Sequence, residues 1–175
     1  MQLATLMGFI VLTGASGSGK TAIAQAIASR YGEYVDVYHF DQIGVPPREQ
    51  MIAKYGSGEA WQRAKTHEWM AKIAAKHRTR GDVLFEGQMR CTFVLEAAAA
   101  AAIKKFALIL VDCDDATRIR RLTSERCQQN LANPTMMDWA QYLRDEANQL
   151  RCTILDTTHL SLEDCAQWIW TQFSR

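Results

Sequence analysis

The stretch VLTGASGSGKT, residues 11–21, decides the fold. Its last eight residues match the pattern G-x-x-x-x-G-K-[S/T], in which a glycine-rich turn points successive backbone N–H groups at an anion. An apolar segment precedes the turn, and a helical pattern follows it and adds its positive N-terminal end. The stretch therefore predicts a phosphate-binding loop, called the P-loop below, made of Gly14, Ala15, Ser16, Gly17, Ser18, Gly19, Lys20 and Thr21.

The last two residues of the P-loop have distinct predicted tasks. Lys20 can reach the outer phosphates of a nucleotide, and the Thr21 hydroxyl can ligate magnesium. The loop thus predicts a nucleotide and Mg²⁺ as ligands. A chance glycine-rich turn is the alternative, and the apolar segment before it and the helix after it count against that alternative.

Outward from the P-loop, short apolar runs alternate with longer helical patterns along the chain. This alternation is typical of an α/β domain with a parallel sheet covered by helices, and the 175 residues suffice for one such domain, residues 1–175. Ser161 and Asp164 predict the N-terminal cap of the last helix. Strands are predicted at residues 8–13, 34–40, 82–86, 105–112 and 152–156, and helices near residues 20–31, 59–79, 90–102, 116–126, 135–150 and 162–173.

Two stretches interrupt the alternation. Residues 41–58 contain Pro46, Pro47 and three glycines, which predict a loop with at most one short helix. Residues 127–134, CQQNLANP, are polar and break the helical pattern on both sides. Ligands of open parallel sheets bind beyond the carboxyl ends of the strands, so we expect both stretches to reach that edge.

Composition narrows the class of protein and its compartment. A net charge of +1 argues against a general nucleic-acid binder, which normally has a basic surplus. The five cysteines are scattered and form no C-x-x-C pair, which favours a reducing cytoplasm over a disulfide framework. No basic leader precedes the first apolar segment, and the alanine run at residues 96–105 is too short to span a bilayer, so no membrane association is expected.

The acidic partner of the magnesium has two candidates. The run LILVD, residues 108–112, is typical of a motor-type ATPase strand ending in an aspartate, but Cys113 stands where such enzymes usually have a catalytic glutamate. The other candidate is Glu86 in FEGQMR, residues 85–90, where a predicted strand ends and Arg90 opens a helix.

Three segments resemble P-loop kinases of small molecules. FEGQMR resembles the D-G-F-P-R segment of adenylate kinases and related nucleoside-monophosphate kinases, with Glu86 for the aspartate and Arg90 for the arginine. VDCDDATRIRRLTSER, residues 111–126, resembles the strand and arginine-rich helix that lead into the lid of these enzymes. ILDTTHLSLEDCAQWI, residues 154–169, resembles the last strand and helix of gluconate and shikimate kinases.

This resemblance implies a fold and a division of labour along the chain. The fold is a three-layer α/β/α sandwich whose five-stranded parallel sheet has the order 2-3-1-4-5. The resemblance also implies an acceptor-site segment at about residues 41–80 and a short lid at about residues 126–135. By the same match, Thr21 and Glu86 organise magnesium, and residues 157–159 lie close to the adenine.

The arginines near the lid are candidate catalytic residues. Phosphoryl transfer depends mostly on positioning and charge neutralisation. Arg118, Arg121 and Arg126 lie on or just after one predicted helix, and the spacing of the first two places them on one face. Together with Lys20 they are predicted to stabilise the transferred group, and a solvated basic face paired with acidic neighbours is the alternative.

The acceptor side has its own candidates. Asp41 ends the second predicted strand, where a carboxylate can accept the proton of an acceptor hydroxyl, or alternatively cap a helix or hold magnesium through water. The match to the kinase segment implies that Arg90 binds an anionic group of the acceptor, and a surface arginine that opens a helix is the alternative. Arg48 and Arg63 are candidates to assist it, with surface pairing to Glu49 and Glu59 as the alternative.

Trp61 and Trp69 lie in the same segment at helical spacing. This spacing predicts a core stripe in preference to a platform for stacking bases.

Together these features predict an ATP-dependent phosphotransferase whose partners are ATP and a small-molecule acceptor, a hydroxyl on an anionic metabolite, nucleoside or nucleotide. The alternative is a nucleotide-dependent switch or ATPase that acts on a protein or nucleic-acid partner. The two hypotheses differ in whether water alone serves as acceptor. The sequence does not set the oligomeric state.

Overall fold

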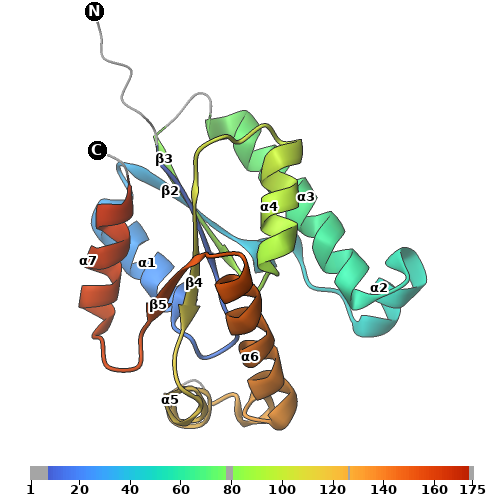
Figure 1. The fold of residues 1–175 in the computed structure, drawn as a ribbon, viewed down its shortest axis with the longest axis vertical. Coiled ribbons are helices and arrows are strands. Elements are labelled where there is room, and N and C mark those ends of the chain that lie inside the picture. The colour runs from blue at the N-terminus through green and yellow to red at the C-terminus, as the bar shows by residue number, and fades with distance from the viewer. Residues whose placement is uncertain (1–7, 78–80, 126, 174–175) are drawn as a thin grey trace, which may run out of the picture.

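A five-stranded parallel sheet forms the centre of the computed structural model, which describes residues 8–77, 81–125 and 127–173 (Figure 1). Its strand order is β2-β3-β1-β4-β5, as predicted. The strands are β1 (Phe9–Thr13), β2 (Val35–His39), β3 (Asp82–Gly87), β4 (Ala107–Asp112) and β5 (Thr153–Asp156).

The central strand β1 is buried along its whole length, between β3 and β4. A strand covered on both faces has no solvent side, so its sequence is a continuous apolar run without alternation. The P-loop follows directly at the carboxyl end of β1, between the ends of the two neighbouring strands.

Helices cover both faces of the sheet and complete the predicted three layers (Figure 1). The first layer buries a cluster around Ile23, Ile27 and Ile169, and the second buries a cluster around Met70 and Leu143. Within the described residues, no helix is both long and apolar enough to cross a membrane. The first layer is α1 (Lys20–Tyr31) and α7 (Leu162–Gln172), and the second is α3 (Gly58–His77), α4 (Cys91–Ala100) and α6 (Pro134–Gln149).

The tryptophans of α3 belong to the core, which confirms the predicted stripe. Trp69 is 5% exposed, and its indole N–H donates to the Phe40 carbonyl at 3.0 Å. Trp61 is equally buried and meets the Phe40 ring edge to face, with 5.8 Å between ring centroids. These contacts attach α3 to the chain that leaves β2.

The segment after β2 contains the one short helix that the prediction for residues 41–58 allowed. A 3₁₀ turn (Phe40–Ile43) is followed by the helix α2 (Arg48–Tyr55). Pro47 immediately precedes the first turn of α2, and Gly56 ends it in the left-handed conformation with φ of +87°. The proline and glycine that indicated a loop therefore mark the two ends of a helix.

The helix that leads toward the lid has the predicted extent but changes type along its length. The α-helix α5 (Asp115–Arg120) continues as one π-helical turn (Arg121–Glu125), and a 3₁₀ turn (Gln129–Leu131) precedes α6. Arg118 and Arg121 both donate to P-loop carbonyls, so they lie on the same side of this segment, as their spacing predicts.

The helices α5 and α7 both have side-chain caps. Asp114 accepts from the backbone N–H of Thr117 at 2.7 Å and so begins α5. Ser161 accepts from the backbone N–H of Asp164 at 3.0 Å, which confirms the predicted cap of α7. The Ser161 hydroxyl in turn donates to the Asp164 carboxylate at 2.6 Å.

Candidate active site

The P-loop curls between β1 and α1 in a backbone path that only glycine follows without strain. Gly19 immediately precedes α1 with φ of +102°. At Gly14 a β-carbon would lie 2.3 Å from the Val111 carbonyl oxygen of β4, so a larger residue would push the loop off the sheet. The predicted loop thus lies at the carboxyl end of the sheet, with its N–H groups at the start of a helix.

Thr21, the last residue of the P-loop, contacts Glu86. Lys20 is 8% exposed, and the Thr21 hydroxyl donates to Glu86 Oε2 at 3.3 Å. Glu86 reaches this place because the parallel register pairs it with Leu12, one residue before β1 ends. The hydroxyl and the carboxylate supply the oxygen donors that magnesium prefers, so these residues fit the ion predicted for them.

Sequence reasoning missed the residue that fixes Glu86 from the other side. His39 Nδ1 lies 2.6 Å from Glu86 Oε1, because the register of β2 on β3 pairs these two residues directly. Glu86 itself is 5% exposed. With His39 on one oxygen and Thr21 on the other, the carboxylate is held in one orientation.

The other candidate acid, Asp112, is taken up by two arginines. Arg118 Nη2 and Arg144 Nε each donate to one of its carboxylate oxygens at 2.6 Å. The bond to Asp112 raises the pKa of the Arg144 guanidinium. Asp112 therefore serves as the anchor of an ion-pair cluster, on the opposite side of β1 from Glu86.

Arg118 lies against the P-loop and is bonded to protein groups. It is fully buried, and its guanidinium donates to the Ser16 carbonyl at 3.0 Å and the Cys113 carbonyl at 3.1 Å besides Asp112. Helix α5 packs this side chain against the P-loop. Direct contact with ATP stays a prediction, and the observed contacts favour a positioning task.

Arg121 bridges the P-loop and the loop after β5. Its guanidinium donates to the Ser18 carbonyl at 3.1 Å, to the Thr157 hydroxyl at 2.9 Å and to the Thr157 carbonyl at 2.9 Å. The predicted catalytic residue Arg126 lies outside the described residues. The transfer roles of both arginines stay predictions.

A pocket of about 520 Å³ opens on this side of the P-loop. It extends from the P-loop to the start of α7, so the loop after β5 that was expected near the adenine forms one of its walls. The lining residues are Gly17, Ser18, Gly19, Thr21, Ala22, Ile23, Gln25, Arg120, Arg121, Glu125, Thr157, Leu160, Leu162 and Cys165.

A second pocket, of about 340 Å³, lies on the other side and is called the transfer pocket below. It brings together the predicted residues Lys20, Thr21, Asp41 and Glu86. Its remaining lining residues are Ser16, Phe40, Val45, Trp61, Gln62, Gly87, Gln88, Gln128 and Leu131.

Two glutamines of the transfer pocket were not singled out from the sequence. Gln62 bridges the strand-end loop, donating to the Gln88 carbonyl at 2.8 Å and accepting from the Arg90 N–H at 3.3 Å. The side-chain oxygen of Gln128 is buried, and the described residues supply it with no hydrogen-bond partner. An amide in a polar stretch carries no distinctive sequence signal, so only the fold reveals it.

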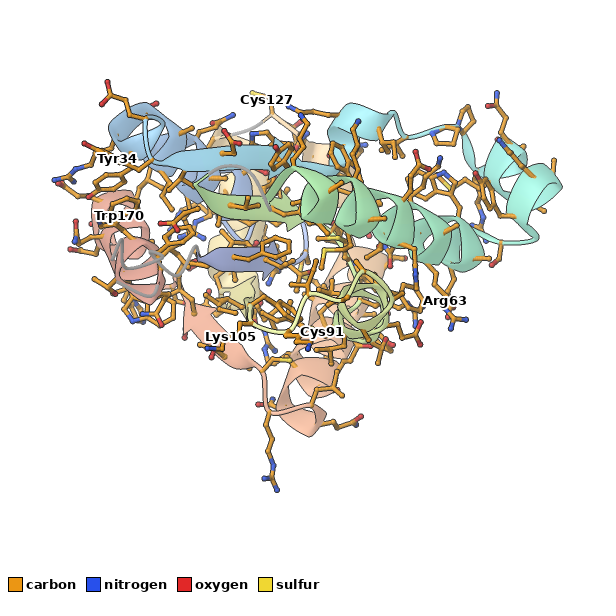
Figure 2. All side chains as sticks on the ribbon, turned by 90° about the horizontal axis from the view of Figure 1, so that it is seen from above. Tyr34, Arg63, Cys91, Lys105, Cys127 and Trp170 are labelled. Atoms are coloured by element: carbon orange, nitrogen blue, oxygen red, sulfur yellow. The ribbon has the colours of Figure 1, made fainter. Side chains whose placement is uncertain are left out.

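The three arginines predicted to bind the acceptor are absent from the described lining of both pockets. Arg48 begins α2 and is exposed. Arg63 pairs with Glu96 of α4 at 2.7 Å, at the periphery of the second helix layer (Figure 2). In the described part of the chain, neither of them lines either pocket.

Arg90 is held in an aromatic setting. It pairs with Glu59 at 3.0 Å, donates to the Tyr142 hydroxyl at 2.7 Å and lies 4.6 Å from the centroid of that ring. It too is absent from the described lining of both pockets. Acceptor binding by these three arginines stays a prediction.

Comparison with known proteins places the chain in a family. A family model described as an AAA domain matches residues 10–131, which include the P-loop, Glu86 and Asp112. The chain belongs to this AAA-domain family. Among curated protein sequences, none matches this AAA-domain chain.

Solved structures share the fold of this AAA-domain protein. Shikimate kinase from Acinetobacter baumannii has a TM-score of 0.64 at 14% identity, covering 95% of this chain and 93% of its own. The tunicamycin resistance protein of Deinococcus radiodurans has a TM-score of 0.67 at 18% identity, covering 95% of each chain. A gluconokinase from Sinorhizobium meliloti 1021 has a TM-score of 0.54 at 18% identity, covering 91% and 87%. The resemblance to P-loop small-molecule kinases is thereby confirmed for the fold.

Proposed function

We propose that this protein is an ATP-dependent kinase that phosphorylates a hydroxyl group of a small molecule. One observation carries the proposal: Lys20, Thr21, Glu86 and Asp41 line the same pocket beyond the strand ends. A phosphate-binding loop alone fits any nucleotide-binding protein. A further carboxylate beside it, on the side away from the larger pocket, is what a hydroxyl acceptor requires.

The nucleotide is proposed to lie across the P-loop. Its base would occupy the pocket between the P-loop and the loop after β5, where Arg121 and Thr157 already contact each other at 2.9 Å. Lys20 would contact the outer phosphates, and Thr21 and Glu86 would hold magnesium. When bound there, the ion would neutralise negative charge on the phosphates.

In the transfer step, the acceptor oxygen forms a bond to the γ-phosphorus as the bond to the β,γ-bridging oxygen breaks and ADP leaves. The hydroxyl proton passes to the Asp41 carboxylate. Asp41 is exposed at the start of a 3₁₀ turn, so the acceptor meets it from the solvent side. Residues 41–80 are proposed as the acceptor-site segment and residues 126–135 as the lid that excludes water.

Arg118 is proposed as a positioning residue. Its bond to the Ser16 carbonyl fixes the middle of the P-loop, and Asp112 fixes the guanidinium in turn. Because Arg118 is fully buried, the pair holds its geometry without competition from water. Arg121 and Arg126 remain the proposed cations at the transferred phosphate.

The test is an acceptor screen. The purified protein is incubated with Mg²⁺, γ-labelled ATP and fractionated small molecules from a cell extract, beside Lys20→Ala, Asp41→Asn and the exposed-lysine control Lys72→Ala. We expect label in a new metabolite, which mass spectrometry identifies. Lys20→Ala should lower the rate by roughly 10²–10³-fold and Asp41→Asn by at least about 10²-fold, while Lys72→Ala should match wild type.

A different result of the same screen would contradict the proposed kinase function. Label released only as free phosphate at a steady rate, whatever fraction is added, would contradict the kinase and support the nucleotide-dependent switch. If Asp41→Asn and wild type phosphorylate the acceptor at equal rates, the kinase function is supported but Asp41 is not the general base.

A further inference from the structure

A third pocket adjoins the transfer pocket and is called the lysine pocket below. It has a volume of about 410 Å³ and is formed by the 3₁₀ turn after β2, helix α2 and the first turns of α3. Val45 and Trp61 line both this pocket and the transfer pocket, so the two adjoin along these side chains. The other lining residues are Ile43, Gly44, Pro46, Gln50, Lys54, Tyr55 and Lys65.

The two adjoining pockets differ in charge. Among its described lining residues, the transfer pocket has two carboxylates, Asp41 and Glu86, and one cation, Lys20. The described lining of the lysine pocket has two cations, Lys54 and Lys65, and no carboxylate. The first arrangement suits a hydroxyl and a metal ion, and the second attracts an anion.

Both lysines line the pocket, and the ammonium of Lys65 is also paired with a carboxylate outside the lining. Lys54 lies in the last turn of α2, with its ammonium 5.5 Å from the centroid of the Tyr55 ring. Lys65 donates to Glu68 at 2.6 Å, and this bond raises the pKa of Lys65, so the ammonium stays charged at neutral pH. The Glu68 side chain is more than half exposed, on the next turn of α3, and is not part of the pocket lining.

The surface between the two pockets is apolar and firmly held. Trp61 packs edge to face on Phe40, and the exposed Val45 lies in the loop before α2. A ligand that spans both pockets would therefore place a hydrocarbon portion on Trp61 and Val45 and its polar ends in the two pockets.

We propose that the acceptor is an elongated phosphomonoester, with its reacting hydroxyl beside Asp41 and its existing phosphate between Lys54 and Lys65. The hydroxyl half of this inference rests on the proposed kinase function. The phosphate half rests on the charge and position of the lysine pocket alone. The proposal thus assigns anion binding to two lysines that line a cavity, in place of Arg48, Arg63 and Arg90.

The phosphate half is tested by direct binding. The protein is labelled with ¹⁵N, its P-loop is filled with magnesium and a non-hydrolysable ATP analogue, and inorganic phosphate is titrated while amide shifts are followed. Sodium chloride at matched ionic strength is the reference. We expect saturable shifts at Lys54, Tyr55 and Lys65, with half-saturation at roughly millimolar phosphate, as for a small dianion held by two cations.

Variants assign the binding to the lysines. Lys54→Gln and Lys65→Gln should each weaken phosphate binding by about three- to tenfold, and the double variant should abolish saturation. Lys65→Arg, which keeps the charge, should stay within about twofold of wild type. Lys72→Gln is the matched control, because this exposed α3 lysine stacks on Trp69 and is outside the pocket lining. Phosphate binding that the double variant retains, or no saturable binding in wild type, would overturn the inference.

The acceptor screen separates this inference from the proposed function. If wild type phosphorylates an uncharged acceptor and the double variant keeps its kcat/KM, the kinase stands and the elongated phosphomonoester is excluded. If no metabolite is labelled but phosphate binding depends on both lysines, the proposed kinase function is contradicted and the proposed phosphate site is supported. A labelled phosphomonoester whose KM rises about tenfold or more in the double variant, with kcat little changed, supports both.

Discussion

Glu86 and Asp112 lie near the carboxyl ends of the two strands that flank the P-loop strand, and they are buried to a similar degree, at 5% and 6% exposure. Their partners differ. Glu86 contacts a histidine and a hydroxyl and lines the transfer pocket. Asp112 forms ion pairs with two arginines and is absent from the described lining of that pocket. Similar burial thus accompanies a pocket-lining carboxylate in one case and a structural anchor in the other, and the partner side chains distinguish the two.

The largest expected effect is on the Glu86 side. Glu86→Gln removes the negative charge beside Thr21 and keeps the shape, so kcat should fall by about 10²–10³-fold, or about 3–4 kcal/mol in the barrier. The free energy of unfolding should change little, because the amide can still bond to Thr21 and His39. Rate assays and urea unfolding check the two halves.

If Glu86→Gln unfolds more easily while its kcat stays at the wild-type value, then Glu86 has the structural role that we assign to Asp112. Raising the Mg²⁺ concentration should restore part of the lost rate, since a weaker ligand set saturates later.

Asp112→Asn should act on stability instead. It leaves the Arg118 charge, 0% exposed, without its anion, and breaking such a buried pair costs about 3 kcal/mol. Urea unfolding measures the loss. Below the unfolding transition we expect kcat within a few-fold of wild type, with a modest rise in KM for ATP through the Ser16 carbonyl.

A double-mutant cycle sharpens this expectation. Asp112→Asn combined with Arg118→Met removes both charges, so the pair should be less destabilised than the sum of the single variants. Strict additivity would mean that the short contact contributes no coupling. A large loss of kcat in Asp112→Asn would make Asp112 part of the chemistry.

His39→Gln should have a smaller effect, again on the Glu86 side. A side chain that orients a metal-binding carboxylate typically contributes 10–100-fold, and we expect about tenfold in kcat/KM. The change should appear as a higher Mg²⁺ requirement with ATP binding nearly unchanged. His39→Asn, whose amide is shorter, should be no better, and wild-type Mg²⁺ dependence in both variants would remove His39 from the site.

What the sequence predicted and what it missed follow from the range of the interactions. The P-loop and the cap at Ser161 are local patterns, so spacing along the chain was enough to predict them. Glu86 was found through a strand-end motif. His39 depends on the register between β2 and β3, and no spacing within either strand encodes that register.

Arg118 shows what helical spacing alone does not reveal. Its distance of three residues from Arg121 indicated a shared face, and both guanidiniums do donate to P-loop carbonyls. The complete burial of Arg118 and its ion pair with Asp112 could not be predicted from that spacing. The decisive contact joins the end of a strand to the following helix, which needs the packed fold.

The smallest expected effect concerns the helix that carries Arg118. The backbone N–H of Thr117, and then its side chain, hold the pKa of the Asp114 carboxyl below its ordinary value of 3.8. A carboxyl with a lowered pKa in the folded state contributes stability that is present above that ordinary value and is lost as the pH falls through the folded pKa.

Asp114→Asn keeps a capping oxygen but cannot ionise. The difference in unfolding free energy between wild type and Asp114→Asn should therefore be constant above about pH 5 and shrink toward pH 3, as measured by urea unfolding across that range. Asp138→Asn, an exposed change on α6, is the control and should show no comparable slope. If this difference in unfolding free energy grows as the pH falls, the ionised Asp114 carboxylate does not stabilise the start of α5, and the cap does not help to hold Arg118 beside Asp112.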